Sequence, residues 1–98
     1  MEILKNKNGN ALTLTLKGRL ETTTAPALEA VVINELGGVD SLTLDLSDLD
    51  YISSAGLRVL LRAQKTMNLQ GAMVVTNVGE TVREIFEITG FSDILTIE

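Results

Sequence analysis

Two short segments in which leucine occupies every second position constrain the fold of this chain most strongly. In residues 11–16 leucine alternates with threonine, and in residues 41–46 it alternates with serine, threonine and aspartate. A period of two places the leucines on one face of a β-strand and the polar residues on the other face. Because a helical pattern lies between the two segments, we expect a crossover connection and parallel pairing of the two strands.

The remaining elements follow from turn and helix signals along the chain. Asn8-Gly9-Asn10 predicts a tight turn after a strand over residues 2–7, and Gly18 is expected to end the second strand. A threonine from 22–24 is expected to cap the first helix, which has Pro26 in its first turn and stops at Gly37-Gly38. We predict further helices over about 55–69 and 80–89, and further strands over 41–46, 72–75 and 94–97.

These elements give the order ββαβαβαβ within a single domain of residues 1–98. The expected fold class is α/β, close to α+β, with a mixed sheet of four to five strands. Three helices should pack mainly on one side of this sheet. The continuous apolar run over residues 72–75 predicts a central strand that is covered on both faces.

Charge and composition exclude several functional classes. Thirteen acidic residues stand against eight basic ones, a net charge of −5, which disfavours nucleic acid or an anionic membrane as a partner. The chain has no histidine and no cysteine, which argues against a zinc or copper site and excludes a serine hydrolase triad. No secretory signal and no apolar run long enough for a membrane span occur. We therefore expect a cytoplasmic protein without a metal that is not an enzyme.

A pair of serines follows the second leucine-alternating segment. Asp45, Asp48 and Asp50 are expected to lie in or beside a loop, where they set local charge and neither bind a metal nor catalyse a reaction. Ser53 and Ser54 then stand at the start of an apolar helix. A helix amino end offers free backbone N–H groups and the positive end of the helix dipole, so it tolerates an added phosphate.

The residues alone leave two interpretations of these serines open. One serine can serve simply as the helix N-cap, and this interpretation is the favoured one on physical grounds. Alternatively, one serine is a phosphorylation site that changes the surface seen by a partner. Gly56 in the first helical turn lowers helix propensity, which makes sense if another group closely approaches the backbone there.

The segment from Asp48-Leu49 to Tyr51-Ile52-Ser53-Ser54-Ala55-Gly56-Leu57 resembles the signature of STAS domains, specifically of anti-sigma factor antagonists. Gly18-Arg19-Leu20-Glu21 resembles the family pattern at the end of the second strand, and residues 71–75 and 85–94 resemble its closing elements. In that family the serine two residues before the glycine is the phosphate acceptor. The resemblance therefore implies a STAS fold and phosphorylation of Ser54, with Ser53 as the second choice.

The resemblance also implies the partners and the cycle of the protein. The unphosphorylated form would bind an anti-sigma factor that is also a serine kinase, and so release a sigma factor for transcription. Phosphorylation would dissociate this complex, and a serine phosphatase would reset it. No cofactor is expected in this chain, because ATP and Mg²⁺ belong to the partner kinase. The residues expected to contact the partner are Glu21, Thr22, Thr23, Ser53, Ser54, Gly56, Leu57 and Arg58.

Two positions depart from the family pattern. Ser53 stands where many members carry aspartate, so a negative charge is lost and two hydroxyls lie side by side. Arg58 stands where a small residue is frequent, and we interpret it first as a solvated side chain, although it could reach back to a phosphate.

One alternative of a different class stays open at this stage. The chain could be a STAS subunit of a transport or lipid-trafficking complex that is never phosphorylated. Ser54 would then be only an interface or cap residue.

Overall fold

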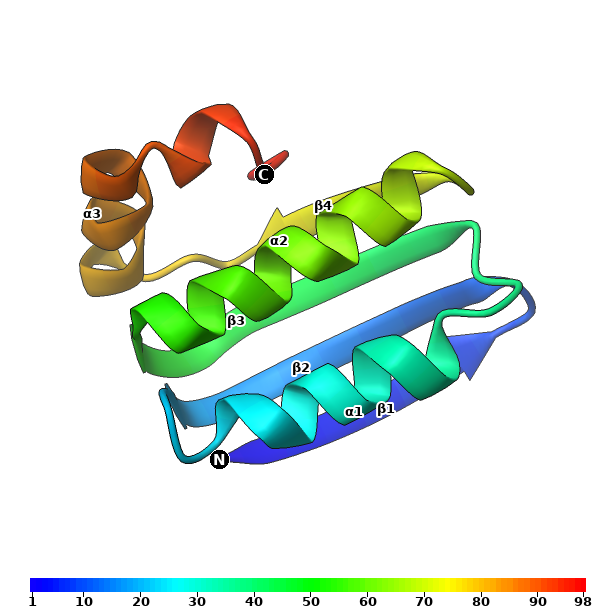
Figure 1. Cartoon of the computed structure of the whole chain (residues 1–98), viewed down its shortest axis with the longest axis horizontal. Coiled ribbons are helices and arrows are strands. Elements are labelled where there is room, and N and C mark those ends of the chain that lie inside the picture. Colours follow the sequence, from blue (N-terminus) through cyan, green and yellow to red (C-terminus); the bar gives the residue numbers. More distant parts are fainter.

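The protein alternates strands and helices in the order ββαβαβα, followed by one short 3₁₀ turn (Figure 1). The structure is a computed structural model that describes residues 1–98. Its elements are β1 (Glu2–Asn8), β2 (Ala11–Leu20), α1 (Ala25–Glu35), β3 (Ser41–Ile52), α2 (Ser54–Asn68), β4 (Ala72–Thr76), α3 (Glu80–Thr89) and the 3₁₀ turn η1 (Phe91–Asp93). The predicted element order is confirmed up to the closing strand.

The four strands form one mixed sheet in the order β1-β2-β3-β4. Strand β1 pairs antiparallel with β2 through the predicted hairpin, whereas β2, β3 and β4 run parallel. The register places Leu14 beside Leu44 and Leu44 beside Val75. The alternating leucines of neighbouring strands therefore form one continuous apolar face, as the period of two predicts.

Helices α1 and α2 cover this apolar face and run side by side along the strands (Figure 1). The leucines of β2 and β3 are almost fully buried beneath them, while Thr13 and Thr43 lie on the partly exposed opposite face. Helix α3 lies beyond the end of β4 and buries Val82 and Phe86. The core is thus one mainly aliphatic layer between sheet and helices, with Phe86 as its aromatic member. No helix combines the length and the apolar character needed to cross a membrane.

Strand β3 is longer than the sequence predicts, and the expected acidic loop does not exist. The strand continues to Ile52, because two register shifts against β2 restore its pairing after each interruption of the alternation. Such bulges place two residues of one strand opposite one of the other. Asp48 and Asp50 remain exposed within the strand, so the prediction of a loop at these residues was wrong.

Strand β4 and the end of the chain also differ from the sequence prediction. Strand β4 is an edge strand with alternating burial, and only one of its faces is fully covered, so the predicted central strand was wrong. The closing strand is reduced to one bridge, in which the Val75 amide donates to Thr96 O at 2.8 Å and the Glu98 amide to Val75 O at 2.9 Å. This bridge covers the outer edge of β4, which would otherwise expose unpaired backbone groups.

Strand β2 also passes its expected end. It continues to Leu20, with Gly18 inside the strand at a positive φ of 101°, next to a register shift. A glycine that was interpreted as a stop therefore lies inside a continuous strand, beside the shift at which β3 gains one residue over β2.

Candidate functional site

The carboxyl ends of β2 and β3 and the amino end of α2 meet at one end of the molecule. The Ser53 amide donates to Leu20 O at 2.9 Å, which ties the end of β2 to the start of the helix. Ser53 is the N-cap residue, and its carbonyl accepts the Leu57 amide at 2.9 Å. Ser54 is therefore the first helical residue, and its side chain is exposed to solvent.

The two adjacent serines have different environments. The Ser53 hydroxyl oxygen is buried and has no hydrogen-bond partner, whereas Ser54 is exposed. Neither hydroxyl caps the helix, because no side-chain hydrogen bond forms at the amino end of α2. The interpretation of a serine hydroxyl as a simple N-cap is therefore wrong.

Gly56 lies beneath the surface, where the first turn of α2 rests on the ends of two strands. A Cβ atom at this position would lie 2.7 Å from Leu20 Cγ and 2.9 Å from Ile52 Cγ1. These distances are too short for any side chain, which explains the glycine in a helical turn. Because Gly56 and Leu57 are both buried, these two residues position the helix and expose little surface to a partner.

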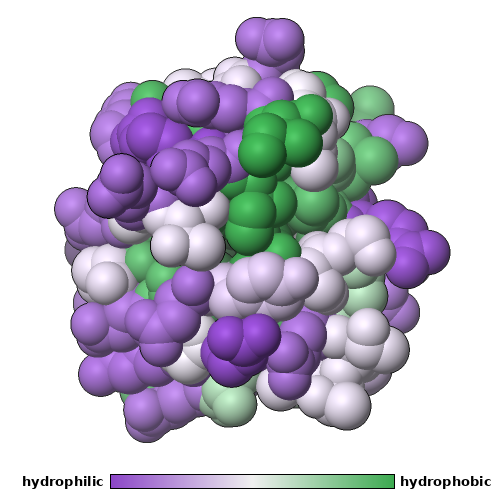
Figure 2. Space-filling view, turned by 90° about the vertical axis from the view of Figure 1, so that its left-hand side faces the viewer, coloured by the Kyte–Doolittle hydropathy of each residue, from purple (hydrophilic) through white to green (hydrophobic).

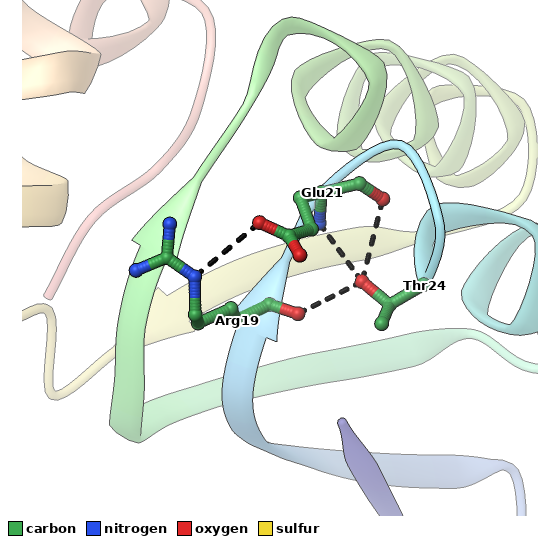
Figure 3. Close-up of polar contacts among 3 residues, drawn as sticks. All are labelled: Arg19, Glu21 and Thr24. Atoms are coloured by element: carbon green, nitrogen blue, oxygen red, sulfur yellow. Dashed lines mark hydrogen bonds and ion pairs between the residues drawn. The ribbon is translucent and has the colours of Figure 1, made fainter.

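The turn between β2 and α1 is held by the Thr24 hydroxyl (Figure 3). This hydroxyl accepts the Glu21 amide at 2.8 Å and donates to the Arg19 carbonyl at 2.8 Å. It makes no bond to the amino end of α1, although Thr24 is the N-cap residue of that helix. The prediction that a threonine hydroxyl caps α1 was therefore wrong, because this hydroxyl stabilises the preceding turn instead.

Arg19 organises the charge at this end of the sheet. Its Nε lies 3.3 Å from a Glu21 carboxylate oxygen (Figure 3), and its guanidinium carbon lies 4.5 Å from the centre of the Tyr51 ring. The register explains the second contact, because Arg19 and Tyr51 are direct neighbours across β2 and β3. Sequence reasoning did not find this contact, since the two bulges hide the pairing.

Two shallow hollows flank the start of α2. One, of about 400 Å³, is lined by Ser54, Leu57, Arg58, Thr89 and Phe91. Figure 2 shows a hydrophobic area between hydrophilic side chains at this end of the molecule. The other hollow lies between α1 and α2, and its lining includes Thr22 and again Arg58. Arg58 forms no ion pair and borders both hollows.

Among the residues singled out from the sequence, the structure thus brings together Thr22, Ser54, Leu57 and Arg58 around the two hollows. Thr23 is exposed but lines neither hollow. Thr89 and Phe91 were missed, although Phe91 is one of only three aromatic residues in the chain.

Comparison with known proteins identifies the family. The STAS domain model matches residues 2–98. The chain belongs to the STAS-domain family of anti-sigma factor antagonists. It is 39% identical over 99 residues to BtrV of Bordetella bronchiseptica, which is named as an anti-sigma factor antagonist, covering 99% of this chain and 85% of BtrV.

Solved structures of STAS proteins share the fold. An anti-sigma factor antagonist from Mycobacterium paratuberculosis superimposes with a TM-score of 0.88 at 22% identity, covering 98% of this chain and 83% of the other. The Bacillus cell fate determinant SpoIIAA, in its phosphorylated form, gives a TM-score of 0.77 at 16% identity, covering 99% and 91%. The resemblance inferred from the serine segment and the STAS fold are both confirmed.

Two of the carboxylates that precede the serines of this STAS domain form a hydrogen bond or an ion pair with neighbouring residues. Asp45 accepts the Ser47 amide at 3.0 Å and the Asn77 side-chain amide at 3.1 Å, and these two hydrogen bonds lower the pKa of its carboxyl group. Asp48 lies 3.8 Å from Lys17 Nζ. No three carboxylates come close enough together to hold a metal ion.

Proposed function

We propose that this STAS domain, over residues 1–98, is a cytoplasmic partner-switching protein controlled by phosphorylation of Ser54. In its unphosphorylated form it binds an anti-sigma factor that is also a serine kinase, and so releases a sigma factor. The observation that carries this proposal is the exposure of Ser54 beside a neighbouring serine whose hydroxyl oxygen is buried. A kinase can approach the Ser54 hydroxyl without disturbing the core, but it cannot reach the Ser53 hydroxyl in the same way.

The position of Ser54 explains how one phosphate can switch binding and leave the fold intact. A phosphate adds a charge of roughly −1.5 to −2 at neutral pH. At the amino end of α2 it meets free backbone N–H groups, the positive end of the helix dipole and the unpaired Arg58. In an interface the same phosphate would lose its water, so a docked partner is released.

The family supports this assignment of partner and cycle. BtrV is named as an anti-sigma factor antagonist, and SpoIIAA, which shares the fold, exists in a phosphorylated form. In this proposal the chain is the substrate of the kinase and not a catalyst. ATP and Mg²⁺ bind to the kinase, and a serine phosphatase removes the phosphate.

The test combines phosphate transfer with binding. The protein is incubated with purified anti-sigma factor kinase of the same organism, ATP and Mg²⁺, and the modified residue is located by mass spectrometry. We expect one phosphate, on Ser54, which is absent in Ser54→Ala and retained in Ser53→Ala. Ser54→Asp should weaken kinase binding by at least about tenfold with an unchanged far-UV circular dichroism spectrum.

Two results would contradict the proposal. Stoichiometric phosphorylation of Ser54→Ala would move the acceptor to another residue. Kinase binding without any phosphate transfer would instead favour a STAS subunit that works without phosphorylation, for example in a transport complex.

A further inference from the structure

The side of α2 that faces the crease between α1 and α2 carries unpaired positive charge. Arg58, Arg62 and Lys65 are exposed and follow one another at intervals of four and three residues, which places them on one side of the helix. None of them lies within 4.0 Å of a carboxylate, whereas three other bases of the chain form ion pairs. Helix α2 contains no acidic residue, although the chain as a whole has a net charge of −5.

Three neighbouring hollows join into one continuous crease along α1 and α2. Glu29 and Arg58 line both the hollow beside Thr22 and the next hollow. Arg62 and Thr66 line that second hollow and also the third. Glu29 is the only carboxylate that lines any of the three. The length of α2 from Ser54 to its carboxyl end corresponds to about 22 Å at 1.5 Å per residue.

Exposed aliphatic side chains lie at the far end of the crease. Leu69 lines its central hollow and is 90% exposed, and Ile33 lines its third hollow and is 54% exposed. The crease thus combines three cations in a row with two aliphatic side chains. A complementary surface must carry carboxylates along one side and apolar side chains at one end.

We propose that the crease between α1 and α2 binds an acidic, amphipathic segment of the protein partner. This inference rests on the proposed function, because the partner is the protein that also meets Ser54. Arg58 links the two surfaces, since it lines the crease and the hollow beside Ser54. One partner can therefore contact both surfaces at the same time.

The surroundings of the crease favour a protein segment over a nucleic acid or an anionic membrane. The acidic remainder of the chain repels an extended polyanion, while a short acidic segment meets only the local positive charge. No aromatic side chain lines the crease, so bases have nothing on which to stack.

The first test measures association with the anti-sigma factor kinase. Arg62→Glu reverses a charge in the crease, and Lys7→Glu makes the same change in net charge on the exposed strand β1. We expect Arg62→Glu to slow association about tenfold at 50 mM NaCl and to flatten its salt dependence. Lys7→Glu should change the rate less than about threefold, because it alters only the overall field. Equal rates for the two variants, with phosphorylation of Ser54 intact, would overturn this inference and leave the proposed function standing.

The second test needs no natural partner. The probe is a 15-residue helical peptide with three glutamates spaced four and three residues apart and leucines on the adjacent face. In ¹⁵N NMR titrations we expect amide shifts centred on Arg58, Arg62 and Lys65. These shifts should vanish with the glutamine version of the peptide and in the Arg62→Glu protein.

A failure of the crease assignment can be told apart from a failure of the proposed function. If the glutamate peptide binds the crease but no kinase transfers phosphate, the crease assignment stands and the proposed function fails. If the glutamine peptide gives the same shifts, or the shifts lie elsewhere, the crease assignment fails. Equal or tighter binding of a 12-nucleotide single-stranded DNA at the crease would overturn the choice of a protein segment.

Discussion

Gly56 shows how a single residue sets the position of the exposed serine. A methyl group at this position would overlap Leu20 and Ile52, so Gly56→Ala must push α2 away from the sheet or distort both side chains. We expect the free energy of unfolding to fall by about 1–3 kcal/mol, the usual cost of overpacking a core, as measured by urea denaturation. Gly37→Ala is the matched control, since no atom lies within 4 Å of its added Cβ, and it should change stability by less than about 0.5 kcal/mol. Equal losses in the two variants would contradict the packing argument.

Asp45 and Asn77 give a second prediction at the scale of single residues. Asn77 has a positive φ of 56°, and its side chain donates to Asp45. Because the Ser47 amide and the Asn77 amide lower the pKa of Asp45 below its ordinary value, the charged carboxylate stabilises the folded state. This stabilisation is fully present above the unfolded pKa and is lost as the pH falls through the lower folded pKa.

The measurement compares the wild type with Asp45→Asn in urea as a function of pH. The wild type should be the more stable protein at neutral pH, and the difference should shrink in acid, as the pH falls through the lowered pKa of Asp45. Carbon NMR titration of Asp45 should show a higher pKa in Asn77→Ala than in the wild type, because one donor is missing. A stability difference that stays constant down to pH 2 would exclude this role of the carboxylate.

At the scale of elements, the sequence predicts regular segments well and irregular ones poorly. The leucine alternation correctly predicts the parallel pairing of β2 and β3, and apolar spacing predicts α2 and α3 almost to the residue. The same logic failed from Ser47 to Tyr51, because a bulge shifts the period and makes a strand resemble a polar loop. It also misjudged β4, since four consecutive apolar residues do not reveal whether a strand lies at the centre or the edge.

Some features of the candidate site can likewise be predicted from the sequence, and others cannot. The serine pair and Gly56 stand out in the sequence, because a local pattern carries them. The difference in burial between the Ser53 and Ser54 hydroxyls cannot be seen in the sequence, because it depends on where helix α2 rests on β2 and β3. The contacts of Arg19 with Glu21 and Tyr51 likewise require the strand register, which the bulges conceal.

The segment after α3 makes a prediction of its own. Leu95 is buried and holds the end of the chain against the core, while its neighbour Ile94 is 47% exposed. Leu95→Ala should lower the free energy of unfolding by about 2–4 kcal/mol and speed exchange of the Val75 amide, which donates to Thr96 O. Ile94→Ala should leave both nearly unchanged. If Val75 exchanged at the wild-type rate in Leu95→Ala, the bridge would not depend on this anchor.

At the scale of the whole molecule, parallel pairing gathers the residues of the candidate functional surface at one end. Because β2, β3 and β4 run in the same direction, the segments that follow them lie at the same edge of the sheet. The turn after β2, the start of α2 and the end of α3 are far apart in sequence, yet residues from each line the two hollows that meet at Arg58. The opposite, threonine-bearing face of the sheet and strand β1 take no part in this arrangement.

This geometry predicts the footprint of the partner. In hydrogen exchange of the complex with the anti-sigma factor kinase, we expect protection in residues 21–24, 54–58 and 89–91, together with the crease along α2. Phosphorylation of Ser54 should remove all of this protection at once, because the charge lies between the two hollows and a docked partner cannot avoid it. Strand β1 should exchange equally in the free and bound protein. Protection confined to β1 would mean that the partner adds a strand to the edge of the sheet, and the end of the sheet would lose its role as the switching surface.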